Sequence, residues 1–225
     1  MQSGVKEKKP EKPVRMGRPP KDLASEVDER ILNAARELFL ARGLSGVSTE
    51  EIARQARASK GTIYARFPTK EALFAAIAMR NAAKVREGYE GGAPSGDTVE
   101  ERLSNLGSEV LKRLLADDNV DFIRLAVAES RRFPDLAKVG RMARERGAQN
   151  AAVVFKEVAD SKQGRAYPAF ASARLAKTIH FFLDLVVAPL LMRAVLGEDP
   201  KSLRAQIRNH VAESVAFFLA ACRSV

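Results

Sequence analysis

The sequence predicts an all-α protein of about nine helices, with a small three-helix N-terminal domain and a larger helical domain behind it. Apolar residues recur at helical spacing through most of the chain after residue 25, and no stretch alternates as a strand would. A second observation is the stretch 48–70, which has the layout of two short helices joined by a tight turn. Together these patterns indicate a helix-turn-helix followed by a helical bundle.

Capping residues define the two short helices within residues 48–70. Ser48 is placed to cap the first helix, and Glu51, three positions later, completes a capping box. Ser59 is placed to cap the second helix. Pro68 ends that helix after Phe67, because the residue before a proline is pushed out of the α region.

The second short helix has a polar face that suits DNA binding. In a helix-turn-helix the second helix enters the major groove. Its exposed positions are expected to be Lys60, Gly61, Thr62, Tyr64 and Arg66. Lysine and arginine meet phosphate or guanine, a threonine hydroxyl meets backbone or base, and glycine lets the backbone approach closely. An ordinary pair of helices with a solvated polar face would show the same pattern, so the pattern alone leaves both interpretations open.

A longer set of residues at fixed spacing surrounds this motif. Its members are Ile31, Leu32, Ala34, Ala35, Leu38, Phe39, Gly43, Thr49, Ile52, Ala53, Ser59, Gly61, Tyr64, Phe67, Lys70, Glu71 and Leu73. With these positions, residues 31–77 resemble the DNA-binding domain of the TetR family of transcriptional regulators. Two positions depart from that family's pattern: Arg57 stands where glycine is usual, and Ala58 where valine or a similar residue is usual. We expect Arg57 to adopt the turn at some cost in backbone energy.

The resemblance implies a sequence-specific regulator that binds double-stranded DNA. The residues expected to contact DNA from the helix-turn-helix are Thr49, Ser59, Lys60, Gly61, Thr62, Tyr64, Arg66 and Lys70, with Lys60 and Thr62 nearest the bases. The operator is expected to be a near-palindrome whose half-sites lie one helical turn, or a multiple of it, apart.

Charge agrees with a nucleic-acid partner. The 225-residue chain carries a formal charge of +10, and residues 1–87 hold 18 Lys and Arg against 11 Asp and Glu, which is +7 of that total. A basic protein that binds a membrane surface would oppose its charges with bulky apolar residues on one helix. The N-terminal basic stretch lacks such a face, so no membrane partner is expected.

Residues 1–24 are expected to form a disordered basic arm, because they are rich in proline and lysine and poor in residues that build a core. Gly17-Arg18-Pro19 resembles part of an AT-hook, although Met16 stands where that element usually has arginine. Such an arm would place Arg18, with Arg15, in a narrow minor groove. A flexible tail that adds only salt-dependent affinity is the alternative.

Two folded domains are expected after the arm. Residues 25–87 would form the DNA-binding domain, whose first helix is capped near Ser25 and ends at Gly43. A linker with four glycines and one proline occupies residues 88–97. Residues 98–225 would then bind an effector and form the dimer.

The last two predicted helices, about 170–196 and 200–223, are too broadly apolar for burial within one chain, so a partner chain is expected. Pro189 should kink the first of them and free the carbonyl of Leu185.

The resemblance also extends into the second domain. Residues 122–136 and 182–197 resemble the C-terminal domain of the AefR-like branch of the TetR family. It implies a homodimer through a four-helix bundle made from the last two helices of each chain. It also implies a small, largely apolar effector among the helices between residues 99 and 196. Binding of that effector would move the helix of residues 70–86 and release the repressor from its operator.

Residue usage favours the cytoplasm. Cys222 is the single cysteine, which excludes an internal disulfide and fits a reducing compartment. The sequence has no apolar run of 18 residues, and its start lacks the apolar core of a signal peptide. The most apolar stretch, 179–192, contains His180 and Asp184, so it is interpreted as a buried helix.

Two other function classes fit less well. His180 with Asp184, and His210 with Glu213, share helix faces, but the order is the reverse of a di-iron motif, and no Cys/His cluster, phosphate loop or nucleophile elbow is present. No enzyme activity, cofactor or metal is therefore expected. These residues would instead satisfy each other, line the effector pocket or cross the dimer interface. A sequence-neutral DNA-packaging protein is the other alternative, and the large, barely basic second domain argues against it.

Overall fold

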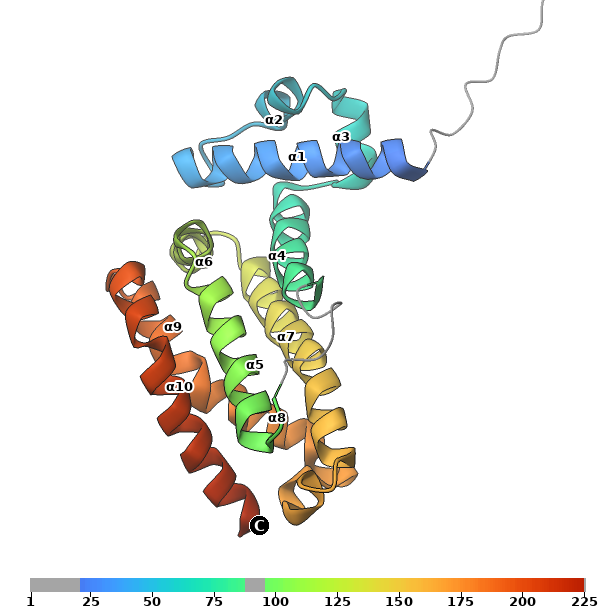
Figure 1. Ribbon diagram of the computed structural model, residues 1–225. Coiled ribbons are helices and arrows are strands. Elements are labelled where there is room, and N and C mark those ends of the chain that lie inside the picture. Colours follow the sequence, from blue (N-terminus) through green and yellow to red (C-terminus); the bar gives the residue numbers. More distant parts are fainter. Residues whose placement is uncertain (1–20, 88–95, 225) are drawn as a thin grey trace, which may run out of the picture.

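The computed structural model describes residues 21–87 and 96–224, and within them it contains α-helices and short 3-10 helices but no strand (Figure 1). The predicted all-α fold is confirmed. The helices are α1 (Lys21–Arg42), α2 (Thr49–Ala56), α3 (Lys60–Arg66), α4 (Lys70–Glu87), α5 (Val99–Leu114), α6 (Asp117–Glu129), α7 (Asp135–Asp160), α8 (Ser172–Val186), α9 (Ala188–Val195) and α10 (Pro200–Arg223). The 3-10 helices η1 (Gly164–Ala166) and η2 (Pro168–Phe170) lie between α7 and α8.

Helices α1–α3 form a head at one end of the molecule, and α5–α10 form a body (Figure 1). Helix α4 runs from the head along the body, beside α7. The predictions for the N-terminal arm, including Arg15 and Arg18, and for most of the linker fall outside the described residues.

The head has an apolar core that continues into the body. Its centre includes the fully buried residues Phe39, Ile52 and Ile63. The same cluster takes in Phe122 from α6 and Val139 from α7. The ring of Phe122 stacks on Phe74 of α4, with centroids 4.1 Å apart and planes at 11°. The head is therefore seated on α6 and α7 as well as being joined to the body through α4.

The body has its own core, and aromatic rings lie at its centre. The ring of Phe155 from α7 meets those of Phe182 from α8 and Phe218 from α10 edge-on, at centroid distances of 5.2 and 6.2 Å. Helix α5 packs closely against α8 and α10 at Gly107. A Cβ at that position would lie 2.8 Å from Cγ1 of Val186, so only glycine fits without displacing its neighbours.

Two predicted helix boundaries are wrong. Helix α1 begins at Lys21, one turn before Ser25, so residues 21–24 belong to a helix and not to the arm. Pro20 is the last residue that restricts the backbone there, and nothing after it stops a helix. The apolar spacing predicts a helix over residues 120–132, but helix α6 spans Asp117–Glu129, about three residues earlier, because the acidic residues at its start favour a helix N-terminus.

The predicted break at Pro189 is confirmed, and the structure shows what lies beside it. Helices α8 and α9 meet at an angle of 47°. Nε2 of His210, from α10, lies 2.8 Å from the carbonyl oxygen of Val186. This ring satisfies a carbonyl at the break, one residue beyond Leu185, the position named from the sequence. A carbonyl left unpaired inside the protein would be costly.

Among the described helices, no single one is long and apolar enough to cross a membrane. Helices α8 and α9 reach the required length and composition only as a bent pair. Their buried residues, among them Ile179, Phe182 and Leu190, belong to the core of the body.

The close packing at Gly107 gives the first testable prediction. Gly107→Ala should be less stable than Gly140→Ala by about 1–3 kcal/mol, because the added methyl group must displace Val186. Gly140 is the matched control, since a Cβ there would meet nothing within 4 Å and both changes raise helix propensity equally. Urea denaturation of the two variants measures the difference. Equal stabilities would show that α5 can move away from α8.

Candidate nucleic-acid interface

Helix α2 begins with the predicted capping box. The Glu51 amide donates to Oγ of Ser48 at 3.2 Å, and the Ser48 amide donates to the Glu51 carboxylate at 2.9 Å. The hydrogen bond from the Ser48 amide, with a further one from Arg42, lowers the pKa of Glu51 to about 2. The carboxylate therefore stays ionised at neutral pH and holds the start of α2 in place.

The turn between α2 and α3 depends on a left-handed residue. Arg57 has φ 51° and ψ 45°, and it is the only non-glycine residue with positive φ in the described part of the chain. The amide of Ala58 then donates to the carbonyl of Ala53 at 2.9 Å, which closes the end of α2. Arg57 thus takes the conformation that a glycine would take more easily, as expected from the sequence.

Helix α3 is held by the predicted cap. The Thr62 amide donates to Oγ of Ser59 at 3.0 Å, and the two hydroxyl groups share a hydrogen bond of 2.8 Å. Ile63 is fully buried and fixes the inner face, while Phe67 ends the helix and is half-buried. Both residues therefore lie on the inner side of α3, away from its polar face.

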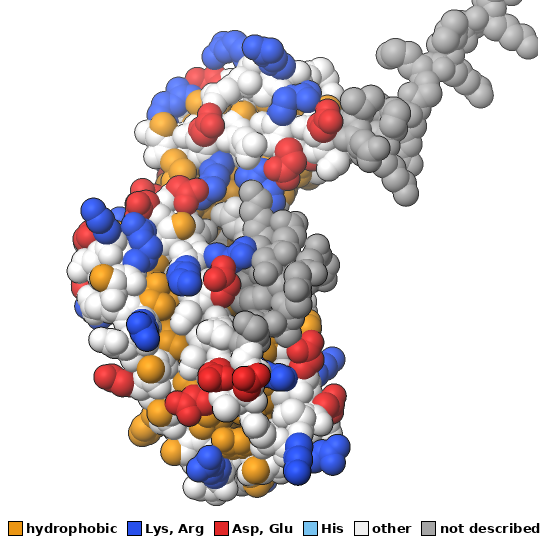
Figure 2. Space-filling model, in the orientation of Figure 1, with side chains coloured by type: hydrophobic (Ala, Val, Ile, Leu, Met, Phe, Trp, Pro, Cys, Tyr) orange, Lys and Arg blue, Asp and Glu red, His pale blue; other side chains and the backbone are white. Residues whose placement is uncertain are grey.

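The outer face of α3 is open to solvent. Lys60 and Gly61 are exposed, and the Tyr64 side chain is 50% exposed. A Cβ on Gly61 would find only Oγ of Ser59, 3.8 Å away, so no neighbour within the protein requires a glycine there. Figure 2 shows Lys and Arg side chains gathered at the end of the head that points away from the body.

Lys60 has an acidic partner within the protein. Its Nζ lies 2.6 Å from Oε1 of Glu50, a residue in the first turn of α2. The hydrogen bond from Lys60 lowers the pKa of Glu50. Thr49, the first residue of α2, lies next to this pair and is half-buried. The structure therefore brings Thr49, Glu50 and Lys60 together at the junction of the two helices.

Two residues predicted to contact DNA have partners inside the head. Nζ of Lys70 donates to the carbonyls of Leu44 and Val47, at 2.6 and 3.0 Å, and so ties the α1–α2 loop to the start of α4. Arg66 pairs with Asp28 of α1. The Lys70 contacts explain a lysine in the first turn of a helix, where the dipole disfavours it. That Lys70 and Arg66 contact DNA stays a prediction.

Three consecutive residues of α4 tie this helix to three others, α1 in the head and α6 and α7 in the body. Nη1 of Arg80 donates to Glu29 and Asn33 of α1, at 2.9 and 2.8 Å. The side-chain amide of Asn81, through Nδ2, donates to Oδ1 of Asn119 of α6 at 3.3 Å. The next carbonyl, that of Ala82, accepts from the buried Asn150 of α7 at 2.9 Å.

A further contact joins α1 directly to α6. Nη1 of Arg36 lies 3.0 Å from the Asp118 carboxylate, and its Nη2 donates to the Asp118 carbonyl at 2.8 Å. The same guanidinium lies over the ring of Phe122, 5.7 Å from its centroid. Sequence reasoning missed this contact and those of Arg80 and Asn81, because their partners lie 38 to 82 residues away in the chain.

Comparisons with known families now bear on this arrangement. Residues 31–77 match the family described as "Bacterial regulatory proteins, tetR family". Residues 101–223, more than half of the chain, match "AefR-like transcriptional repressor, C-terminal domain". The chain belongs to the TetR family. The first matched region covers the head from Ile31 of α1 onwards together with the start of α4, and the second covers nearly the whole body, so both resemblances inferred from the sequence are confirmed.

Individual proteins that are similar in sequence are also transcriptional regulators. The HTH-type transcriptional regulator UidR of Escherichia coli K12 is 44% identical over 66 residues, which span 28% of this chain and 34% of that relative's length. An HTH-type transcriptional repressor of Mycobacterium tuberculosis is 26% identical over 177 residues, 78% of this chain and 86% of the relative. The match to UidR thus spans about a third of that protein, while the mycobacterial match runs through both domains.

Solved structures of TetR-family proteins have the same fold. A TetR-family regulator from Mesorhizobium loti superposes with a TM-score of 0.71 at 24% identity, over 88% of this chain and 97% of the other. A protein named flavonoid-responsive regulator FrrA superposes with a TM-score of 0.63 at 28% identity, over 89% and 98%. The family and its named members are transcriptional regulators, which supports a regulator and not an enzyme here.

Neither His180 nor His210 forms a hydrogen bond or ion pair with the acidic residue that shares its helix face, which is Asp184 or Glu213 respectively. Asp184 forms an ion pair of 2.6 Å with Arg144, and Nε2 of His180 lies 3.7 Å from Glu145. The hydrogen bond from Arg144 lowers the pKa of Asp184. His210, as described above, contacts a backbone carbonyl. Within residues 21–87 and 96–224, no group of three or more His, Cys, Asp or Glu side chains is arranged to hold a metal ion.

The left-handed turn gives a second prediction. Arg57→Gly should stabilise the protein by about 0.5–1 kcal/mol, because glycine adopts this conformation without the clash of a Cβ. Arg57→Ala is the control, since it removes the same charge and keeps the Cβ. Thermal and urea unfolding would measure both variants. An equal gain in both would show that charge, and not backbone conformation, decides the stability at this turn.

The open environment of Gly61 gives a third prediction. Gly61→Ala should leave the free energy of unfolding unchanged or raise it by up to about 1 kcal/mol, yet weaken DNA binding by obstructing close approach of the backbone. Anisotropy measurements on a duplex selected from a random library would give the affinity. Gly140→Ala in α7 is the control and should bind normally. Unchanged affinity in Gly61→Ala would place the DNA farther from α3.

Proposed function

We propose that this TetR-family regulator is a homodimeric repressor that binds a near-palindromic operator and leaves it when a small apolar effector binds. The observation that carries the proposal is the outer face of α3, where Lys60, Gly61 and Tyr64 are open to solvent on a helix fixed from behind by Ile63. Each subunit places this helix in the major groove of one half-site. The DNA-binding domain is residues 25–87, and residues 98–225 form the effector-binding and dimerisation domain.

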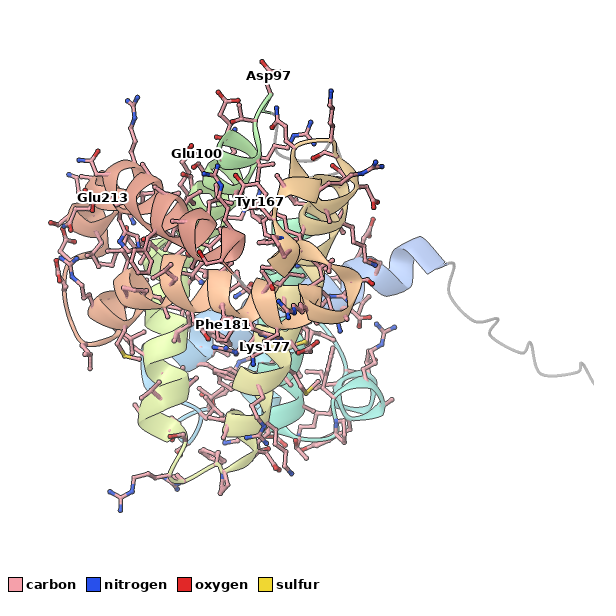
Figure 3. The ribbon with its side chains drawn as sticks, turned by 90° about the horizontal axis from the view of Figure 1, so that it is seen from below. Asp97, Glu100, Tyr167, Lys177, Phe181 and Glu213 are labelled. Carbon is pink, nitrogen blue, oxygen red and sulfur yellow. The ribbon has the colours of Figure 1, made fainter. Side chains whose placement is uncertain are left out.

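Exposed apolar side chains support the dimer. Phe181 of α8, Met192 of α9, Leu196 just after α9 and Phe217 of α10 are 57%, 57%, 79% and 71% exposed. Figure 3 shows Phe181 on α8 beside Lys177, whose Nζ lies 5.5 Å from the centroid of the ring. Large exposed apolar groups gathered on neighbouring elements mark interaction surfaces.

Helix α10 also carries a stripe of exposed small side chains. Its members are Ala205, Ala212, Ala216 and Ala220, which are exposed and lie on one side of the helix. Small side chains let two helices approach closely, as the pairing of α8–α9 and α10 from two subunits requires. The elements are those that the sequence predicted for the dimer, residues 170–196 and 200–223.

The effector is proposed to bind among the body helices between residues 99 and 196. The contacts of α4 with α6 and α7, through Asn81 and Ala82, provide a route from the body to the head. A hundredfold loss of operator affinity needs a coupling free energy of about 2.7 kcal/mol. The similar protein named as flavonoid-responsive favours an aromatic, largely apolar effector for this chain as well. The regulator is proposed to act in the bacterial cytoplasm, where its DNA target lies.

Selection from a random DNA library at near-physiological salt tests the proposed function. We expect one inverted repeat, and a ratio of specific to non-specific affinity of about 10³ or more. A selected pool without a motif, or one that is only A·T-rich, would contradict the proposal and favour a DNA-packaging protein. Release of the recovered operator by a flavonoid or another apolar compound would then identify the effector class.

The dimer gives a fourth prediction. Phe217→Glu should shift the protein towards monomer and weaken operator binding, because the charge would have to be buried at the interface. Val153→Glu is the matched control: Val153 is 49% exposed on α7, which is not one of the helices proposed for the dimer, so its replacement should leave the dimer intact. Sedimentation velocity measures the mass of each variant. A dimer that persists in Phe217→Glu would place the interface elsewhere.

A further inference from the structure

An acidic side chain lies beside Lys60, on the face of the head that is proposed to contact DNA. Glu50 and Lys60 have side chains that are 49% and 58% exposed, and Oε1 lies 2.6 Å from Nζ. The two residues come from different helices, α2 and α3, and meet where the helices converge. A carboxylate at this place is unexpected, because the phosphates of DNA repel it.

The fold does not require Glu50. The capping box of α2 is made by Ser48 and Glu51, so a second acidic residue in the first turn adds only a favourable interaction with the helix dipole. An ion pair this exposed contributes little to stability. A role in recognition therefore explains the residue better than a role in folding.

We propose that Glu50 and Lys60 act as a unit that reads one G·C base pair in each operator half-site, with Lys60 donating to guanine and Glu50 accepting from cytosine. The inference rests on the proposed function, since it needs α3 in the major groove. It makes Glu50 a specificity-determining residue, although the sequence pattern singled out only its neighbours.

The chemistry of the base pair supports this assignment. In the major groove, a G·C pair presents the guanine N7 and O6 acceptors side by side and then the cytosine N4 amino donor. An ammonium group next to a carboxylate has the complementary order, donor and then acceptor. A carboxylate placed against the thymine O4 or methyl group of an A·T pair would lose hydration without gaining a hydrogen bond.

The contact between the two side chains also positions Lys60. A lysine side chain is flexible and meets any phosphate as a point charge, which adds affinity for all sequences. Held against Glu50, the ammonium is kept near the junction of α2 and α3, and Gly61 beside it leaves room for the bases. The pair thus exchanges some general affinity for discrimination between base pairs.

The test repeats the random-library selection with the full-length protein, Glu50→Gln and Lys60→Met. For the wild type we expect an inverted repeat with a G·C pair at one position of each half-site. Both variants should lose the preference at that same position, about tenfold or more in relative affinity, and keep the rest of the motif. Two variants in different helices guard against a folding defect in either one, which circular dichroism would detect.

Glu37→Gln is the matched control. Glu37 is an exposed head residue whose carboxylate accepts a hydrogen bond from Gln55 at 2.6 Å, so the substitution makes the same charge change within the same domain. Its selected motif should equal that of the wild type. A change at the same base pair in Glu37→Gln would overturn the assignment to Glu50.

Several outcomes separate this inference from the proposed function. A wild-type pool without an inverted repeat would contradict the proposed function itself. A wild-type motif that Glu50→Gln retains in full would overturn only the reading role of Glu50, as would loss of preference at two different positions in the two variants. A uniform rise in affinity of Glu50→Gln for all DNA, with a salt slope steeper by about one phosphate contact, would mean that Glu50 only withholds Lys60 from the backbone.

Discussion

The stacking of Phe122 on Phe74 is the contact on which the arrangement of the two parts depends. It places a ring from the body inside the core of the head, 4.1 Å from its neighbour, and both side chains are almost fully buried. Arg36 covers the same ring from the side of α1 and binds Asp118 one turn earlier on α6. Buried aromatic surface makes the largest single contribution to the stability of such a contact. A shift of α6 would therefore also displace the residues of the head that pack against it.

Helix α6 is also anchored on its other side. Arg124 donates to the carbonyl of Ala194 at the end of α9, through Nη2 at 2.6 Å, and Arg204 of α10 binds Asp117 at 2.7 Å. The same short helix therefore contacts the head and the elements proposed to form the dimer. In the proposed dimer, α6 would therefore link each head physically to the surface that sets the distance between the two heads.

Local signals in the sequence predict the head well, but they do not predict contacts between residues far apart in the chain. The caps at Ser48 and Ser59 and the strained turn at Arg57 depend on residues within a few positions, so spacing alone revealed them. The partners of Lys70 and Arg36 lie 26 and 82 residues away in the chain, and no local sequence pattern predicts such contacts.

The sequence predicts the start of α1 one turn too late, because Ser25 is a good capping residue. A capping residue does not prevent a helix from continuing through it. The sequence does not single out Glu50, because an acidic residue in the first turn of a helix is already explained by the helix dipole.

The three ties of α4 limit the ways in which this helix can move. The side chains of Arg80 and Asn81 leave the helix about 100° apart, and Asn150 reaches the Ala82 carbonyl from α7, so contacts with three different helices occur within a rise of a few ångströms. A turn of α4 about its own axis would break all three contacts at once. A tilt about this level strains each of them only slightly, because all three lie near the pivot. A tilt of α4 that pivots at residues 80–82 would therefore displace Lys70, about three turns away, more than it displaces the residues beside the pivot.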